Sequence, residues 1–207
     1  MKTVEFMEKL NSGTLDSAFI DLYGKNAVEL QKKRYAAAVE KFKQTYPEAD
    51  EIEVYSASGR TEVGGNHTDH QHGCVLAAAV DVDVIAVVSF NNSGVMRILS
   101  EGYRPVSVEC DDLEVHKNEN GSAALIRGVA AKFAERGVKI GGFDMYSVSD
   151  VLAGSGISSS AAFETLIGTI IDKHYNNGNH VNINSRRKNT TVLMVCMISA
   201  NLSSARS

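Results

Sequence analysis

A strand, a loop of glycine and serine, and a long helix follow one another between residues 143 and 174, and this order constrains the fold more than any other feature of the sequence. The run from Phe143 to Val148 is predicted as a strand, and Leu152 to Ser158 as a loop. The helix is predicted over residues 159–174, because four side chains recur at the spacing of one helical face: Ala162, Leu166, Ile170 and His174. A chain with this order must combine a sheet with packed helices.

Four further helices are predicted from apolar residues in helical register: residues 4–10, 15–23, 26–46 and 122–136. Thr14 or Ser12 can cap the second of these helices, and Gly24 can end it. Pro47 stops the third, and Gly137 follows the fourth.

Alternating side chains predict a strand over residues 52–56. Runs rich in β-branched residues predict strands over 75–79 and 82–90, and further strands are expected over 95–99 and 106–108. Asn91 to Gly94 is a strong hairpin signal between two of these runs, so an antiparallel meander is expected there. The stretch from Gly59 to Gly73 is expected to be a loop between strands.

The charge balance favours a small polar or phosphorylated metabolite as ligand. Lys and Arg number 21 against 25 Asp and Glu, which gives a formal charge of -4. This balance argues against nucleic acid or an anionic membrane surface as the main partner. The 43% hydrophobic content is that of an ordinary globular protein.

The sequence predicts a cytoplasmic protein. The N-terminal residues contain no continuous apolar segment with a cleavage site for export. The longest apolar run, Val192 to Ile198, is far shorter than the roughly 20 residues of a membrane helix, so no span is expected. Cys74, Cys110 and Cys196 form neither a close pair nor a disulfide framework, which fits a reducing compartment.

The end of the chain differs in composition from the rest. There is no Asp or Glu after Asp172, and the cluster of Arg186, Arg187 and Lys188 lies in this part. The apolar residues there follow no clear helical or strand period. A domain is therefore expected over residues 1–180, with a helical lead-in over 1–48 and a divergent tail over 181–207. The tail is either a polar surface extension or the product of a shifted reading frame.

Residues 59–73 form the first group with chemical potential, because they hold one Arg, two acids, three His and four glycines. A polyol site needs carboxylate acceptors such as Asp69 and bifunctional groups such as Asn66 and His67, with glycines that let the backbone approach the sugar ring. Arg60 would then face an anion. A solvated loop is the plain alternative, and a metal site is less favoured because its candidate ligands match no zinc pattern: His67, Asp69, His70 and His72.

The second group runs from Gly154 to Ala162, between the last predicted strand and the helix that opens near Ser159. Backbone N–H groups at a helix N-terminus are unsatisfied and lie at the positive end of the helix dipole, so they bind anions such as phosphate. The segment is not a Walker loop, because it contains no Lys. A cluster of capping serines is the alternative interpretation.

Together the two groups resemble a known family. G-R-x-x-x-x-G-x-H-T-D with a following G-x-V-L, from Gly59 to Leu76, is similar to the galactose-binding signature of the galactokinases. G-S-G-I-S-S-S-A-A-x-E, from Gly154 to Glu164, is similar to the nucleotide-phosphate loop of the GHMP small-molecule kinases. The resemblance covers about residues 15 to 180 and implies an α+β fold, the GHMP-kinase N-terminal domain (ribosomal protein S5 domain 2-like), with a mixed, mostly antiparallel sheet and helices.

The activity implied by this resemblance is phosphorylation of galactose at its C1 hydroxyl with ATP and Mg²⁺, as in Leloir galactose metabolism. It implies that Arg60 lies beside the reacting hydroxyl, and that Asn66, His67 and Asp69 contact the sugar. It implies a phosphate-binding set whose last serine is also a magnesium ligand: Gly154, Ser155, Gly156, Ser158, Ser159 and Ser160.

This chain departs from the family pattern at several points. Glu62 stands where the family commonly has Asn, and Asn66 where it has Glu. The catalytic Asp of the family, in a G-L-M-D-Q-like segment, has no counterpart after Asp172, and neither has the C-terminal domain. The resemblance therefore implies a truncated copy that is weakly active or inactive alone. A non-catalytic sensor of sugar or nucleotide, or a kinase for another sugar, are the alternatives, and the oligomeric state is left open.

Overall fold

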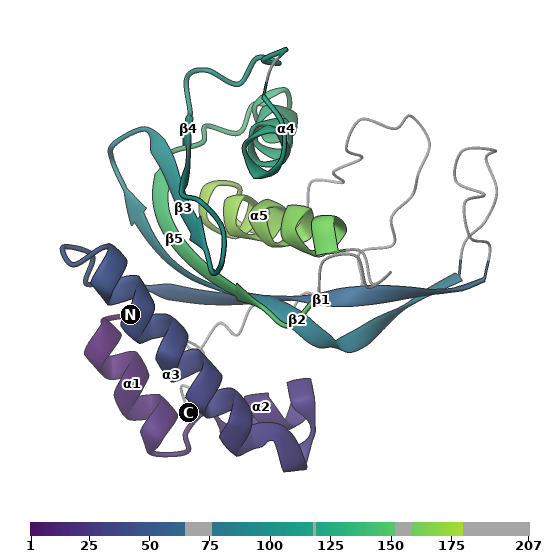
Figure 1. Ribbon diagram of the computed structural model, residues 1–207. Coiled ribbons are helices and arrows are strands. Elements are labelled where there is room, and N and C mark those ends of the chain that lie inside the picture. The colour runs from purple at the N-terminus through teal and green to yellow at the C-terminus, as the bar shows by residue number, and fades with distance from the viewer. Residues whose placement is uncertain (65–75, 118, 152–158, 180–207) are drawn as a thin grey trace.

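One five-stranded sheet carries helices on both faces in the computed structural model of the protein (Figure 1). The structure describes residues 1–64, 76–117, 119–151 and 159–179. The strands are β1 (Glu53–Gly64), β2 (Leu76–Asn91), β3 (Val95–Ser100), β4 (Val106–Glu109) and β5 (Gly142–Ser149). The helices are α1 (Thr3–Asn11), α2 (Asp16–Tyr23), the 3-10 turn η1 (Lys25–Ala27), α3 (Val28–Thr45), α4 (Ser122–Ala134) and α5 (Ser159–Tyr175).

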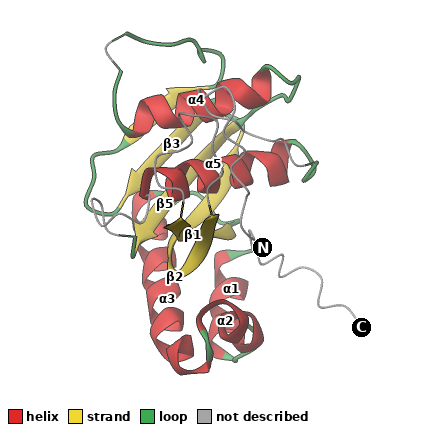
Figure 2. Ribbon diagram, turned by 90° about the vertical axis from the view of Figure 1, so that its right-hand side faces the viewer, coloured by secondary structure: helices red, strands yellow, loops and turns green. Residues whose placement is uncertain are grey.

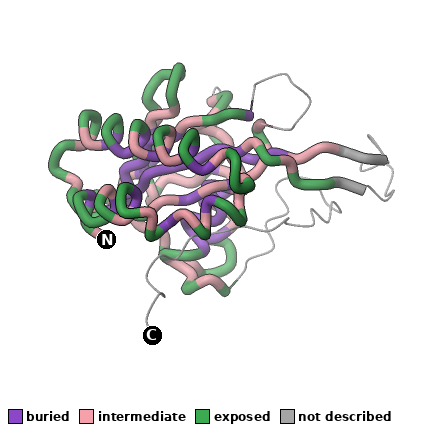
Figure 3. Tube along the Cα trace, turned by 90° about the horizontal axis from the view of Figure 1, so that it is seen from below, coloured by how far each residue is buried: buried purple, intermediate pink, exposed green. Residues whose placement is uncertain are grey.

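The two faces of the sheet have separate hydrophobic cores. Along β2, Val84, Ala86 and Val88 pack with α4 and α5, whereas Ile85 and Val87 pack with α1, α2 and α3. This alternation follows from the period of two in a β-strand. Figure 2 shows the resulting three layers, and Figure 3 shows that the buried residues concentrate along the central strands. The α+β class expected from the sequence is confirmed.

The strand order corrects the predicted hairpin. The sheet runs β1-β2-β5-β3-β4, so β5 lies between β2 and β3 and keeps them apart. β5 pairs antiparallel with β2 and parallel with β3. The expected meander over residues 82–99 is therefore wrong, although β3 and β4 do form an antiparallel pair.

The reason lies at Gly142, the first residue of β5. A Cβ atom built there would lie 2.5 Å from Asn91 Oδ1 and 2.6 Å from the Val95 carbonyl oxygen. Glycine thus lets β5 enter the sheet directly against the turn that joins β2 to β3. A local turn signal such as Asn91 to Gly94 describes only neighbouring residues. It cannot predict that a strand about 50 residues further along the chain inserts between the two runs.

The lengths of the first two strands also differ from the prediction. β1 continues to Gly64, so Gly59 to Gly64, expected to begin a loop, belong to a strand. The two predicted runs 75–79 and 82–90 are one strand, β2. An irregularity in the β1–β2 pairing, between Ser58 and Arg60, accounts for the break in pattern that divided β2 in two.

The predicted helices are confirmed, but their caps are not all as expected. Ser12 and Thr14 hydrogen-bond each other at 2.8 Å instead of capping α2, which begins after Leu15 without a side-chain cap. Gly24 does end α2, and its φ of 78° is one that glycine adopts without strain. In the residues that the structure describes, none of the helices is both long and apolar enough to cross a membrane.

The C-terminal end of α5 is fixed to the start of β1 by His174. Its ring stacks on Phe90 with the centroids 3.3 Å apart, and its Nδ1 lies 3.8 Å from Glu53 Oε1. Burial lowers the pKa of His174 below its ordinary value, and the opposing effect of Glu53 is smaller. The neutral imidazole is therefore the form that the fold favours.

Stability is expected to fall on acidification from about pH 7 to about pH 5, where an ordinary histidine titrates. The unfolded chain, with a higher His174 pKa, binds more protons in this window than the folded chain, so the unfolding free energy decreases as the pH falls. Urea titrations at several pH values, for the natural chain and for His174→Gln, measure this slope. An identical slope in the two proteins would contradict the assignment to His174.

Candidate functional site

The first motif, residues 59–73, begins on a two-stranded extension of the sheet. The last pair between β2 and β5 is Val84 with Ser149, but the pairing of β1 with β2 continues to Gly64 and Leu76. The far ends of β1 and β2 therefore project beyond β5 as a ribbon (Figure 1). Residues 65–75 connect the two strands at its tip.

The second motif, which runs from Gly154 to Ala162, leads into α5. This helix runs antiparallel to β1. His174, near the end of α5, lies beside Glu53 at the start of β1. From His174 back to Ser159 the helix rises about 23 Å, and from Glu53 to Arg60 a strand extends about 23 Å. The N-terminus of α5 is therefore directed toward the part of β1 that carries Arg60.

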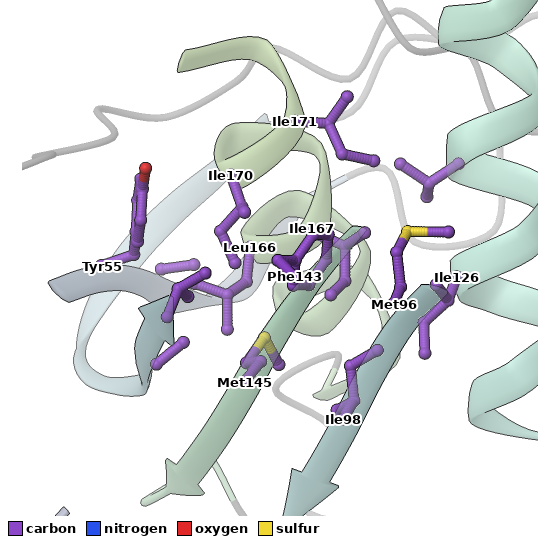
Figure 4. Close-up of a cluster of buried hydrophobic side chains, with 14 of the residues drawn as sticks. Tyr55, Met96, Ile98, Ile126, Phe143, Met145, Leu166, Ile167, Ile170 and Ile171 are labelled. Carbon is purple, nitrogen blue, oxygen red and sulfur yellow. The ribbon is translucent and has the colours of Figure 1, made fainter. Parts of the chain in front are cut away.

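Apolar side chains hold α5 in this direction. Tyr55 and Ala57 of β1 belong to the same buried cluster as Leu166 and Ile170 of α5. Figure 4 shows Tyr55 beside Ile170 and Leu166, in the layer between helix and strand. The position of the N-terminus of α5 relative to the β1–β2 ribbon is thus set by a packed core.

The structure describes three of the predicted site residues. Arg60 lies in β1 opposite Ala79 and is partly buried. Ser159 and Ser160 are the first residues of α5, the former partly buried and the latter exposed. The other predicted site residues lie outside the described residues: Asn66, His67, Asp69, Gly154, Ser155, Gly156 and Ser158. The His70 and His72 of the metal alternative also lie outside them.

The electrostatics at the start of α5 suit an anion. The first turn of α5 contains no acidic side chain. The helix dipole and the unsatisfied first-turn N–H groups both favour negative charge at this end. The exposed hydroxyl of Ser160 is accessible to a ligand or a hard cation. Across the described part of the chain, no group of three or more His, Cys, Asp or Glu side chains is arranged to hold a metal ion.

The sequence did not predict a buried polar cluster around Asp83, which lies on the face of the sheet that α2 and α3 cover. The Asp83 side chain is 4% exposed, and its carboxylate accepts hydrogen bonds from Ser56 Oγ, from Tyr23 Oη at 2.5 Å and from Arg34 Nη1 at 2.5 Å. Burial, and then the neighbouring Tyr35 and Asp83, raise the pKa of Tyr23, which keeps this hydroxyl protonated as a donor. A single acid inside the apolar strand 82–90 was the signal that could have revealed the cluster.

Comparison with known proteins gives consistent results. Residues 40–90, which include most of β1 and β2, match the family model described as the galactokinase galactose-binding signature. The chain is 31% identical to a galactokinase of Bacillus subtilis over 138 residues. The aligned region covers 65% of this chain and 35% of that protein. The chain thus spans about a third of the length of this relative.

The fold is shared with solved kinases. The structure of Lactococcus lactis galactokinase complexed with galactose matches with a TM-score of 0.65 and 24% identity, over 72% of this chain and 39% of that one. The mevalonate kinase of Methanococcus jannaschii matches with a TM-score of 0.51 and 12% identity, over 61% of this chain and 41% of that one. By its signature and its relatives the chain resembles the galactokinases over the part of their length that it spans, and it has the fold of the GHMP kinases.

Proposed function

We propose that the protein to which this chain belongs transfers the γ-phosphoryl group of ATP to the C1 hydroxyl of galactose in the cytoplasm. The observation that supports this most is the arrangement of the described elements that flank the two motifs. Residues 40–90, which match the galactose-binding signature, include the strands of the β1–β2 ribbon, and the N-terminus of α5 is directed toward that ribbon. A sugar and a nucleotide phosphate bound at these two places would meet, as a transfer reaction requires.

The sugar would be held by the first motif. Asn66 and His67 can both donate and accept hydrogen bonds, and Asp69 can accept them, which matches the hydroxyls of a hexose. Arg60, in β1, would stabilise the negative charge that develops on the phosphoryl oxygens during transfer.

The phosphates would be held at the N-terminus of α5. Backbone N–H groups of the segment 154–160 would bind the phosphate oxygens. The proposed phosphate-binding residues are Gly154, Ser155, Gly156, Ser158, Ser159 and Ser160. Magnesium fits here because the Ser160 hydroxyl is exposed and hard cations prefer oxygen ligands. When bound, the ion would neutralise part of the phosphate charge.

Calorimetric titration of the 207-residue chain with ATP, ADP and adenosine, with and without Mg²⁺, tests the nucleotide part of this proposal. Affinity is expected to grow with the number of phosphates, because the helix N-terminus acts on charge and not on the nucleoside. Ser160→Ala should weaken ATP binding about tenfold in the presence of Mg²⁺ and leave adenosine binding unchanged, as expected for the loss of one hydrogen bond to a charged group.

Ser122→Ala is the control, because Ser122 lies in the first turn of α4, as Ser160 lies in the first turn of α5, and α4 is attached to neither motif. It should leave the affinity for every nucleotide unchanged. Equal losses of ATP and adenosine binding in Ser160→Ala would indicate a helix cap and not a phosphate site.

Binding without transfer is the second candidate function. An assay for phosphorylated galactose separates the two functions. Binding of galactose and ATP by a protein that forms no product would support a sensor, whereas product formation would contradict it.

A further inference from the structure

Arg34, which projects from α3 onto the sheet, contacts two strands at one point. Its Nη1 lies 2.5 Å from Asp83 Oδ1 and 3.1 Å from Asp150 Oδ2. Its Nη2 donates to the carbonyl oxygens of Asp83 at 3.0 Å and Val148 at 3.4 Å. The side chain is only 11% exposed, so these contacts form in a largely buried place.

This point is where both motif-bearing segments leave the sheet. Asp83 pairs with Ser58 immediately before the irregularity in the β1–β2 pairing, and the ribbon of the first motif begins there. Asp150 comes directly after β5 and donates its backbone N–H to the Asp83 carbonyl oxygen at 3.0 Å. The second motif follows within the next few residues of the chain.

The chemistry of the cluster requires an arginine. Buried carboxylates are costly unless they are paired and hydrogen-bonded, and Asp83 is buried. The planar fork of the guanidinium can reach the Asp83 carboxylate, two carbonyl oxygens and Asp150 at once. A lysine ammonium carries the same charge but cannot span these four acceptors.

We propose that Arg34 is a positioning residue, which fixes the ribbon of the first motif and the exit of β5 toward the second motif relative to each other. This inference rests on the proposed function, because it assigns Arg34 the task of aligning the sugar and phosphate sites. Arg34 itself lies on the α3 face of the sheet and touches neither substrate. Its loss changes binding through the geometry of the two segments.

The pair of Arg97 and Asp144 provides a matched control. Arg97 Nε lies 2.5 Å and Nη2 2.8 Å from the two carboxylate oxygens of Asp144. This is again an Arg–Asp pair on the sheet, here between β3 and β5, but Asp144 is about 20 Å along the strand from Asp150, at the opposite end of β5. Arg97→Met therefore removes an ion pair without touching the root of either motif.

The first test measures amide hydrogen exchange by NMR in the 207-residue chain. In Arg34→Met, exchange of the Asp150 amide is expected to become about tenfold faster, because the Asp83 carbonyl that accepts it is no longer held in place. Arg97→Met should leave this amide at its natural rate. Natural-rate exchange at Asp150 in folded Arg34→Met would overturn the proposal, whatever the ligand affinities are.

The second test measures the dissociation constants of galactose and of ATP by calorimetry. Arg34→Met should raise both about tenfold, Arg34→Lys should give partial rescue, and Arg97→Met should change neither. Asp150→Ala should weaken the binding of ATP by about threefold and leave the binding of galactose unchanged. The Asp150 side chain is 46% exposed, so its ion pair is weak, and its loss acts only on the segment that follows β5. Folding of this variant is expected to be nearly natural, so it decides the matter if Arg34→Met does not fold.

The outcomes separate the two claims. A natural chain that binds neither ATP nor galactose contradicts the proposed function, and the exchange measurement still decides the role of Arg34. A natural chain that binds both, with unchanged affinities in the Arg34 variants and in Asp150→Ala, contradicts the positioning role alone.

Discussion

Gly142→Ala is expected to lower the unfolding free energy by about 3 kcal/mol, at the upper end of what overpacking costs. The added methyl group would meet Asn91 Oδ1 at 2.5 Å and the backbone N and O of Val95 at 2.7 and 2.6 Å. The Val95 backbone belongs to β3, so it cannot move without breaking the pairing around β5. Urea denaturation followed by circular dichroism measures the loss.

Gly128→Ala is the control for this prediction. Gly128 lies inside α4, and nothing lies within 4 Å of a Cβ atom built there. Alanine should therefore raise the unfolding free energy by about 1 kcal/mol, through helix propensity and a less flexible unfolded chain. If the denaturation midpoints of the two variants were equal, the close approach of β5 to the β2–β3 turn would be contradicted.

Asp69→Ala is expected to weaken galactose binding by about 10- to 100-fold, which corresponds to about 1.5–3 kcal/mol for hydrogen bonds to a charged acceptor. ATP affinity should not change, because the nucleotide is assigned to the other motif. Calorimetric titration of each ligand into the same protein sample gives both numbers.

Asp81→Ala is the matched control, because Asp81 is an exposed carboxylate on the ribbon that carries the first motif. It should bind galactose as the natural chain does. If Asp69→Ala kept the natural galactose affinity, or lost ATP affinity equally, Asp69 would not belong to the sugar site.

Local patterns predicted the elements of this fold better than their arrangement. The helices α3 and α5 follow from apolar residues at helical spacing, since each packs one face against the sheet. The hairpin at Asn91 to Gly94 was wrong because a turn signal describes only neighbours in sequence, and β5 is inserted from far along the chain. Gly142 makes that insertion possible through a contact that no pattern in the sequence displays.

The candidate site, like the fold, could be predicted from the sequence only in part. The residues of the two motifs could be named from the sequence, because glycines, serines and carboxylates occur there at family spacings. The role of Arg34 could not, because its acceptors Asp83, Val148 and Asp150 lie 49 to 116 positions away in the chain. Only the folded arrangement brings them to one guanidinium.

The central place of β5 also determines when the sheet can form during synthesis. The pair β1–β2 and the pair β3–β4 are complete once residue 109 has been made, but no strand pairs with both β2 and β3 until residues 142–149 emerge from the ribosome. Until then β2 and β3 each present an unpaired edge, the kind of surface on which nascent chains associate with one another. Because β5 closes the sheet late, we expect these two edges to stay exposed for part of the time that the chain is being translated.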